Sequence, residues 1–569
     1  MKRQVLTLVC LLGTLIVNGQ TNTDTPDVAT VSGSIQSDML FPQSDSKIGA
    51  EKHGDFNTNS YADILMQSRY VDAGVRFEFL DYPLPGFEQD FKGTGLPNAW
   101  LKLKLKDHSL TLGTFYEQFG SGFILRTYEE RSLGIDNSLL GARLMVAPVK
   151  GVSLKALSGF QRRYWEWNDA LISGADAELS IDQWIPAMQE KSTSLMIGAS
   201  WVNKHEKPDD DIFIDLTHRL NTPRFVNSWD ARLSLKVKNW NLLAEYAQKS
   251  EDPNYYNGYI YKKGNAAMLS TSYSHKGLSV LLQAKRSENM ASVSRRKENS
   301  TYNASSYNHL PAFTQDQTYA LAAFYPYATQ LTDGEWAYQA ELGYNFKRGT
   351  ALGGKYGMNV KVNFSYVRSI NRDFIDGKFR RTIAGNMELA GTDGYKSSFF
   401  KWGDQTYYQD LDITLTRRFT KNFKLNLMYM NQRYNQLQIQ QHGGMVRANI
   451  FVADGLFQLA RKTRLRCELQ YMQTKQDYGD WVFGLLELSL APHWMFTLSD
   501  MWNVGDSDPA QYTENTHYHY YQALVTFNIG SHRIQAGYGR TREGINCSGG
   551  VCRVIPAQKG FTLSYNYNF

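Results

Sequence analysis

The sequence contains no long apolar run after its first twenty residues, and this absence excludes a helical membrane protein. A membrane-spanning helix needs about 20 consecutive, mostly apolar residues, and the 569-residue chain has no such stretch beyond its N-terminus. It also has no long Pro/Ser/Gly-rich linker and no heptad run. Segments typical of strands continue almost from end to end, which indicates one β-domain.

The motifs of common hydrolases are missing too. Neither Gly-x-Ser-x-Gly nor His-Glu-x-x-His occurs in the chain. The net charge of +6 is small for this length, and the basic residues are scattered rather than gathered in a block. We therefore predict that the protein is not an enzyme, uses no cofactor and does not bind nucleic acid.

Cysteine is scarce, with four residues in the chain. Cys10 lies in the apolar N-terminal stretch, and Cys467 lies on the apolar face of a predicted strand. Cys547 and Cys552 flank a short Ser-Gly-Gly-Val loop. A small-loop disulfide between these two is the natural expectation in an oxidising compartment.

The N-terminus has the layout of a secretory signal peptide. Lys2 and Arg3 precede an apolar stretch over residues 5–17, and a plausible cleavage point follows at 18–20. We predict a signal peptide at 1–19, a short segment at 20–29 and a barrel over 30–569. Export to the periplasm would follow.

Aromatic residues are abundant, although mean hydropathy is below zero. The chain has 35 Tyr, 29 Phe and 12 Trp. Apolar and polar residues alternate with period two in many segments, as strands with two different faces require. The clearest segments are 100–106, 231–238, 359–367, 464–470 and 561–569. A soluble sandwich shows the same alternation, so further features must decide.

Three features favour a barrel in a bacterial outer membrane. Many predicted strands span about 10 to 15 residues, as tilted membrane strands do. Very short turns alternate with long polar loops, predicted at 83–97, 164–192, 250–264, 288–315, 370–403 and 543–558. The last strand ends on Phe569, a pattern that the barrel-insertion machinery recognises. Outer-membrane lipid, lipopolysaccharide and that machinery are therefore the expected partners, with envelope proteins as further possible ones.

The predicted fold is a single all-β, antiparallel transmembrane barrel without a separate plug domain. Closure removes every sheet edge, and lipid requires all backbone groups to be paired. The candidate strands predict an even number from about 18 to 26, with 24 as the best value. Strand parity between about 164 and 228 is not settled by the pattern.

The densest motif lies in residues 110–148 and includes Gly113, Phe115, Tyr116, Glu117, Gln118, Phe119, Gly120, Gly122 and Arg126. With residues 245–247 and 252–253, it resembles a family of uncharacterised outer-membrane proteins from Bacteroidota. The resemblance implies an outer-membrane barrel over most of the chain. It implies no activity.

Two interpretations of the 113–131 stretch stay open. Glycines among aromatics indicate close backbone approach or a bulge, and the charges of Arg126, Glu129, Glu130 and Arg131 follow at once. The stretch could be a salt-bridged loop that folds back and braces the barrel. It could instead form a constriction or a ligand clamp in the lumen.

The predicted lumen face is rich in basic residues, because charges cannot face lipid cheaply. The candidate pore-lining residues are Lys102, Lys104, Lys106, Arg232, Lys236, Lys361, Arg464 and Arg466. They could pair with carboxylates, or they could form a pore that favours anions. The first functional hypothesis is porin-like or transporter-like passage of small polar solutes. The second is a non-conducting scaffold or accessory subunit of an envelope assembly.

Metal sites are weakly indicated, and we predict none. His517 and His519 would share a strand face, but no third ligand is visible, so an interfacial position is the simpler interpretation. The acidic runs at 209–211 and at Asp506 and Asp508 lack the regular spacing of a calcium loop. Solvated loops are expected there.

Overall fold

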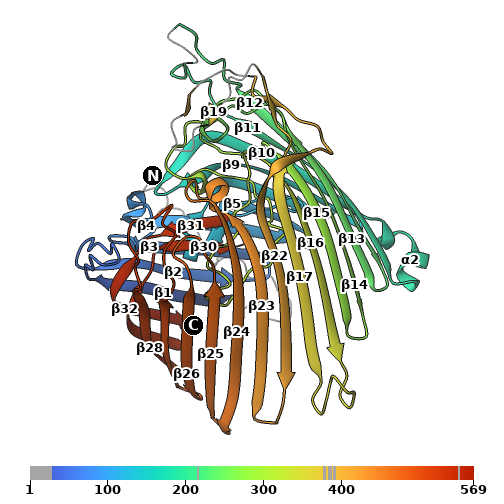
Figure 1. The fold of residues 1–569 in the computed structure, drawn as a ribbon. Helices are drawn as coiled ribbons and strands as arrows, with labels where there is room; N and C mark the ends of the chain where they lie inside the picture. The colour runs from blue at the N-terminus through green and yellow to red at the C-terminus, as the bar shows by residue number, and fades with distance from the viewer. Residues whose placement is uncertain (1–28, 214–216, 376–379, 382–386, 389–392, 549–550) are drawn as a thin grey trace.

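The computed structural model describes residues 29–213, 217–375, 380–381, 387–388, 393–548 and 551–569 (Figure 1). The signal peptide predicted at 1–19 lies outside these residues, as does nearly all of the 20–29 segment. Among the described residues, no helix is long and apolar enough to cross a membrane.

The described chain forms one closed sheet of 24 antiparallel strands. Strands that follow one another in sequence pair as neighbours, and β32 (Gln558–Asn568) pairs with β1 (Thr30–Pro42) to close the ring. The closure is completed by two backbone hydrogen bonds of 3.0 Å between Gly33 and Phe569. The predicted fold class and the best value of 24 strands are confirmed.

Twelve barrel strands lie in the first half of the sheet order, from β1 onward. They are β1, β2 (Asn57–Gln67), β3 (Val71–Leu80), β4 (Gly93–Leu105), β5 (His108–Phe115), β8 (Leu139–Val146), β9 (Val152–Arg163), β10 (Glu166–Ser180), β11 (Thr193–His205), β12 (Phe225–Val237), β13 (Trp240–Lys249) and β14 (Gly264–His275). The others are β15 (Leu278–Glu288), β16 (Glu335–Phe346), β17 (Met358–Ile370), β22 (Trp402–Arg418), β23 (Phe423–Asn435), β24 (Met445–Ala460), β25 (Thr463–Gln473), β26 (Trp481–Leu490), β27 (Trp494–Asn503), β28 (His519–Ile529), β29 (His532–Thr541) and β32.

Short elements occur in the connections. The two-stranded pairings are β6 (Glu129–Glu130) with β7 (Ile135–Asp136), β18 (Asp373–Phe374) with β21 (Tyr395–Lys396), β19 (Arg380–Arg381) with β20 (Met387–Glu388), and β30 (Gly544–Ser548) with β31 (Val551–Ile555). The helical turns are η1 (Gln89–Phe91), η2 (Arg131–Leu133), η3 (Ile181–Gln183), α2 (Pro186–Glu190), η4 (Tyr255–Asn257), η5 (Tyr302–Ala304) and α3 (Gln436–Ile439).

The strand faces follow the alternation in the sequence, because successive side chains point to opposite sides of a sheet. In β12, Trp229 is exposed on the outside, whereas Asp230 and Arg232 are buried on the inside. In β4, Leu103 and Leu105 are exposed outside, and Lys102 and Lys104 point inward. Large apolar side chains therefore cover the exterior, as in membrane-spanning barrels.

The two ends of the barrel differ in their connections. Tight turns such as 106–107, 238–239 and 530–531 join strands at one end, which we call the short-turn end. At the other end, which we call the outer end, the longest connections are 289–334, 371–401 and 116–138. Two connections at the short-turn end are longer, 181–192 and 347–357. The first forms η3 and α2, and α2 projects away from the barrel (Figure 1).

The long loop predicted at 164–192 is wrong, because β10 occupies most of it. Its alternation is obscured by its inner face, where Ala170, Ile172 and Gly174 are buried. An inner face that touches packed protein needs small and apolar residues, so the polar side of the pattern disappears. The loop predicted at 288–315 is also too short, since β16 begins only at Glu335.

Candidate functional site

Two connections from the outer end fold into the barrel and occupy its lumen. The first inner segment is 116–138, between β5 and β8, and the second is 289–334, between β15 and β16. Side chains with no exposed surface, such as Phe119, Phe123 and Met290, come from these connections. The site that distinguishes this barrel is therefore its filled lumen.

The first inner segment reverses direction at two glycines. Gly120 and Gly122 have φ of +51° and +97°, a backbone region that L side chains rarely adopt. A Cβ on Gly120 would also meet the Glu245 carboxylate at 2.6 Å. That carboxylate accepts hydrogen bonds from the Ser121 amide at 3.0 and 3.1 Å. The turn thus needs glycine and is held to the wall at β13.

The other motif residues serve the same segment. Gly113 has φ of +100°, and Phe115, at the end of β5, is buried. Glu117 accepts from Arg143 and Lys155 of the wall, at 3.2 and 3.0 Å. Two further contacts lie within the segment: Gln118 donates to the Gly120 carbonyl at 2.9 Å, and Arg126 lies 4.4 Å from the Tyr128 ring centre.

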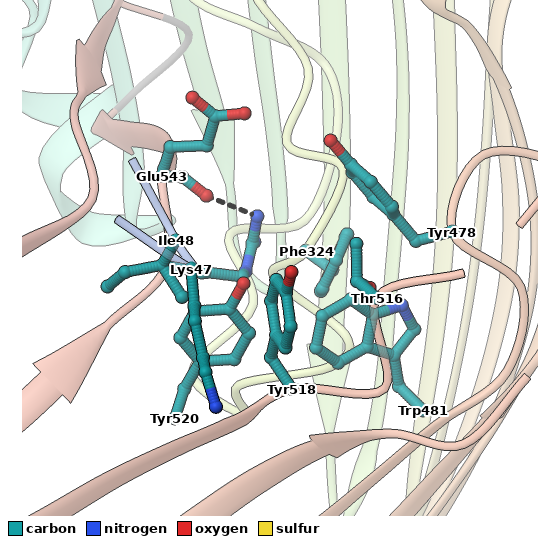
Figure 2. Close-up of a pocket in the computed structure, with 10 residues that line it drawn as sticks. Lys47, Ile48, Phe324, Tyr478, Trp481, Thr516, Tyr518, Tyr520 and Glu543 are labelled. Atoms are coloured by element: carbon teal, nitrogen blue, oxygen red, sulfur yellow. Dashed lines mark hydrogen bonds between the residues drawn. The ribbon is translucent and has the colours of Figure 1, made fainter. Parts of the chain in front are cut away.

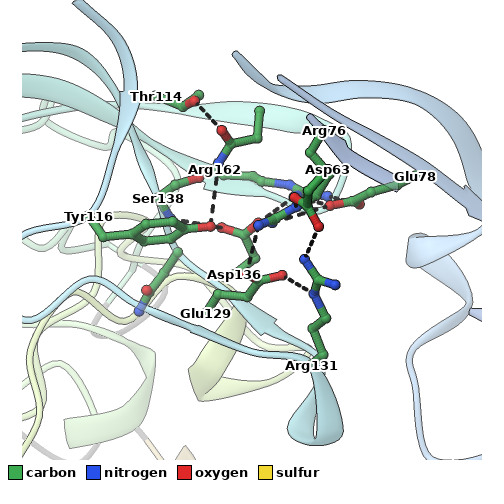
Figure 3. A network of polar contacts seen from close by, with 12 residues as sticks. Asp63, Arg76, Glu78, Thr114, Tyr116, Glu129, Arg131, Asp136, Ser138 and Arg162 are labelled. Atoms are coloured by element: carbon green, nitrogen blue, oxygen red, sulfur yellow. Dashed lines mark hydrogen bonds and ion pairs between the residues drawn. The ribbon is translucent and has the colours of Figure 1, made fainter. Parts of the chain in front are cut away.

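A buried charge network fastens this segment to the wall (Figure 3). Arg76 of β3 reaches Asp63 and Glu129 at 2.7 Å each, and Asp136 at 3.3 Å. Arg162 of β9 contacts Asp136 at 2.6 Å and Glu78 at 2.7 Å. Arg131 and the Tyr116 hydroxyl complete the network. The stretch therefore folds back and braces the barrel, the first of the two interpretations of its sequence.

The second inner segment is hydrogen-bonded to the first. The His309 amide donates to the Gly122 carbonyl at 2.9 Å, and the Arg126 amide donates to the Tyr307 carbonyl at 2.8 Å. The Asn308 side-chain amide donates to the Phe123 carbonyl at 3.0 Å. The two segments, 116–138 and 289–334, therefore form one unit inside the lumen, which we call the plug.

Charged residues also hold the second segment to the wall. Lys204 of β11 contacts Asp252 at 2.7 Å and donates to the Val293 carbonyl at 3.0 Å. Glu298 accepts from Arg163 at 2.6 Å and from nearby serine hydroxyls. These donors lower the pKa of Glu298 to about 2, so the group is charged in any ordinary buffer.

The stretch 310–327 crosses to the opposite wall. The Tyr325 hydroxyl donates to Asp477 at 2.7 Å, and the Leu321 amide donates to the Gln470 side chain at 2.8 Å. Phe324 packs against Trp481, with ring centres 5.1 Å apart. One continuous buried cluster consequently runs from β5, through both inner segments, to β26.

Four of the eight basic candidates on the lumen face are paired with carboxylates. Lys104 contacts Asp72 at 2.6 Å, Lys361 contacts Glu341 at 2.7 Å, and Arg466 contacts Asp454 at 2.9 Å. Arg232 is buried between Asp176 and Asp230, at 2.5 and 3.0 Å. These pairs leave less free positive charge in the lumen than an open anion pore would use.

The other four basic candidates lie close to the short-turn end. Lys106 lies in the turn after β4, with φ of +53°, and not on the strand face where it was predicted. Arg464 donates to the Gln458 side chain at 2.8 Å. Among the described residues, Lys102, Lys236 and Arg464 have no carboxylate within ion-pair distance. Among these eight candidates, the cations without a carboxylate partner thus lie toward the short-turn end.

The two histidines singled out by the sequence do not converge. His519 contacts Asp500 at 2.7 Å, whereas His517 lies before β28 and contacts Asp506 at 3.6 Å. The described residues hold no group of three potential metal ligands. Of the acidic runs, Asp209 contacts Lys297 at 2.7 Å, and Asp508 accepts from the Ala510 amide. These acidic side chains serve loop structure.

The remaining sequence candidates lie in the β29–β32 connection, at the C-terminus and on β25. Cys547 and Cys552 face each other across the β30–β31 hairpin and form a disulfide. Phe569 is exposed, and its ring lies 5.6 Å from that of Tyr567. Cys467 is half-buried on its strand.

The fold and its filled lumen define a large membrane-type β-barrel that is closed by its own loops. The chain belongs to a family described as a family of unknown function (DUF6029), whose model matches residues 1–569. No curated protein matches it.

Three solved structures are similar to the chain at low identity. The P pilus usher (PapC) translocation pore has 10% identity over 95% of this chain and 99% of that chain, with a TM-score of 0.43. A mutant of the ferric enterobactin receptor (PfeA) from Pseudomonas aeruginosa has 10% identity over 96% and 81%, with a TM-score of 0.43. OccAB3 from Acinetobacter baumannii has 10% identity over 95% and 99%, with a TM-score of 0.34. None of these likenesses carries an argument about what this chain does.

Proposed function

We propose that the chain is an outer-membrane barrel that is closed at rest and serves as a scaffold or accessory subunit of an envelope assembly. This is the second of the two functions that the sequence leaves open. The single observation that carries it is the buried cluster that joins opposite walls through both inner segments. Signal-peptide export and a Bacteroidota origin remain predictions from the sequence.

The outer-membrane location is supported by the exterior of the barrel. Leu105 and Leu469 are about two-thirds exposed, and neighbouring strands carry similar apolar side chains. A soluble protein does not expose apolar surface so extensively. Antiparallel barrels of this size belong in bacterial outer membranes.

The filled lumen supports the closed state. An open diffusion pore needs a continuous water path, whereas the core here is packed with side chains such as Phe119, Phe123 and Leu321 that have no exposed surface. Moving the inner segments would also break buried ion pairs, which is strongly unfavourable when one partner loses the other.

Gated passage of anionic solutes is a second candidate, favoured by one observation. Lys102, Lys236 and Arg464 point into the short-turn half of the lumen without a carboxylate partner among the described residues. Unpaired cations at one mouth of a barrel attract anions. For this function, the inner segments would have to move.

Conductance of the refolded mature chain in a planar bilayer tests the closed state. The wild-type barrel is expected to be silent, with insertion verified by heat-modifiable migration on a gel. Replacing residues 311–330 with a short Gly/Ser linker should produce stable conductance steps, because it removes the part of the plug that reaches β22–β26. As a control, shortening the exposed turn 347–357 should leave the bilayer silent. Stable steps from the wild-type chain would contradict the proposal.

The scaffold role has its own test. The chain in gently solubilised native membranes is expected to migrate as a larger particle than the purified, refolded chain. Equal migration of the two would leave a closed barrel without a partner and would remove the scaffold role.

A further inference from the structure

A small cavity of about 120 Å³ lies at the outer end (Figure 2), and its lining includes no residue of the charge network described above. Its walls come from several outer connections and from the second inner segment. The side chains that matter here are Phe324, Tyr478, Trp481, Tyr518, Tyr520 and Arg542. We call this cavity the Arg542 pocket.

Arg542 is a cation without an anionic partner. One of its guanidinium nitrogens donates to the Glu543 backbone carbonyl at 2.8 Å. Its guanidinium carbon lies 3.5 Å from the centre of the Phe324 ring. Among the described residues, no carboxylate lies within ion-pair distance of it. Its neighbour Arg540, by contrast, contacts Asp45 at 3.4 Å.

The Arg542 guanidinium is half-buried, and the charges of Asp477 and Glu543 act on it from outside ion-pair distance. Burial lowers the pKa of Arg542 below its ordinary value, because the surrounding protein replaces water around the charge. A buried cation is stabilised when an anion with good hydrogen-bond geometry meets it. The fork of guanidinium N–H groups matches a carboxylate, which accepts two parallel hydrogen bonds.

Five aromatic residues line the pocket, and several of their rings are held in place by packing. Trp481 packs on Phe324 and Tyr520, with ring centres 5.1 and 6.0 Å apart. Tyr478 stacks on Tyr512 at 4.3 Å. Such faces bind the flat side of another ring. At about 120 Å³, the cavity is somewhat smaller than the cavity of about 150 Å³ that is known to hold benzene, so it has room for no more than one ring.

The rim of the pocket is open to solvent. Lys47 and Glu543 line it, and both are exposed. The Glu543 carboxylate points away from the aromatic rings, and the Lys47 ammonium lies beside Tyr520 (Figure 2). The rim thus carries one exposed cation, Lys47, and one exposed anion, Glu543.

We propose that the Arg542 pocket binds a small carboxylate that carries one ring, with the acid group on Arg542 and the ring among the aromatic side chains. Aromatic acids and acidic monosaccharides share this chemistry. The inference does not depend on whether the barrel conducts or on its partners, so its failure and that of the proposed function are separate results.

Equilibrium dialysis of the barrel in nanodiscs tests the pocket, with empty nanodiscs as the blank. The probes are benzoate and glucuronate, each compared with its uncharged counterpart, benzyl alcohol or glucose. At least one acid should bind tenfold or more tightly than its counterpart, because a charge-assisted hydrogen-bond pair is worth about that factor. Binding of benzoate would point to aromatic acids as ligands, and binding of glucuronate would point to acidic monosaccharides. Equal binding of acid and neutral probe, or no binding of either acid, would overturn the proposal.

Three variants locate the binding. Arg542→Met should weaken binding of the acid at least tenfold, and Trp481→Leu should weaken it without changing the preference for the acid. Arg533→Met, which removes an exposed cation on β29, is the matched control and should change nothing. Unchanged affinity in a folded Arg542→Met barrel would place the ligand elsewhere. If that variant fails to fold, the comparison of acid and neutral probe on the wild-type barrel still tests whether the barrel prefers the acid.

Discussion

The two walls of the barrel hold the plug by different chemistry. On the side of β2, β3 and β9, the first inner segment is fastened by buried ion pairs around Arg76 and Arg162. On the side of β23–β26, the stretch 310–327 is held by aromatic packing and by phenol hydroxyls such as Tyr325 on Asp477.

The difference matters because the two attachments fail differently. Removing one member of a buried ion network leaves other charges without partners, so the loss is large and abrupt. Removing one phenol hydroxyl leaves the ring in place and costs a single hydrogen bond. The ionic attachment of the plug is therefore the stronger one, and the aromatic attachment is the one that we expect to break first.

The largest expected effect is on the ionic side. Arg76→Met leaves Asp63, Glu129 and Asp136 buried with fewer partners, and should lower the free energy of unfolding by about 3–5 kcal/mol. Urea titration of the folded fraction in vesicles, read by heat-modifiable migration, measures it. Arg69→Met, in an exposed turn, is the matched control. A loss below about 1 kcal/mol, within the range of an exposed pair, would show that the network does not fasten the plug.

On the aromatic side, the loss in free energy of unfolding should be smaller. Tyr325→Phe removes the donor to Asp477, which keeps its second donor, the Tyr512 hydroxyl at 2.7 Å. The expected loss is about 1.5–3 kcal/mol, the value of a hydrogen bond to a charged group. The same urea titration applies, with the exposed Tyr70→Phe as control. A loss as large as that of Arg76→Met would erase the contrast between the two sides.

Low pH should lower the free energy of unfolding through protonation of His309, which lies where the two inner segments meet. Burial, with Arg126 and Lys285 nearby, lowers the pKa of His309 to about 3. Its unfolded pKa is about 6.5. The unfolded chain therefore binds the extra proton first, and stability falls as pH drops below about 6.5.

The expected slope is about 1.4 kcal/mol per pH unit below that point, until the pH approaches 3. Urea titrations at pH 7.5, 6.5 and 5.5 measure it, after subtraction of the slope of His309→Gln, which removes this group. A wild-type slope equal to that of the variant would mean that His309 is not buried neutral.

The smallest loss in free energy of unfolding is expected in the half of the lumen near the short-turn end. Lys361 and Glu341 are about one-third and one-quarter exposed, so Lys361→Met should cost about 0–1 kcal/mol. Lys285 and Glu335 form a pair with no exposed surface at 2.8 Å, and Lys285→Met should cost several times more. Similar losses in both variants would show that the two halves of the lumen are equally packed.

The outer surface of the barrel could be predicted from the sequence because lipid imposes a simple rule. Apolar residues such as Leu101 and Leu103 must alternate with polar ones wherever one face meets hydrocarbon and the other does not. Tight turns and strand length then follow from local chemistry. For these reasons the strand faces, the closure at Phe569 and the number of strands follow from short-range patterns.

The plug could not be predicted in the same way. The stretch 310–327 contains Leu321, Phe324 and Tyr325 in a row of mostly apolar residues, and that row is the one signal that a loop is buried. Nothing local marks Arg542 as unpaired, since its surroundings come from several separate segments, among them Phe324 of the second inner segment and Trp481 of β26.

The sequence by itself thus determined a membrane barrel with distinct faces, because the bilayer acts on every strand in the same way and leaves a regular trace. Only the tertiary structure decided whether the lumen is open, which cations are paired and where the Arg542 pocket lies. Those properties depend on contacts between residues distant in the chain, such as Arg76 with Asp136 and Tyr325 with Asp477. Such contacts leave no periodic pattern in the sequence.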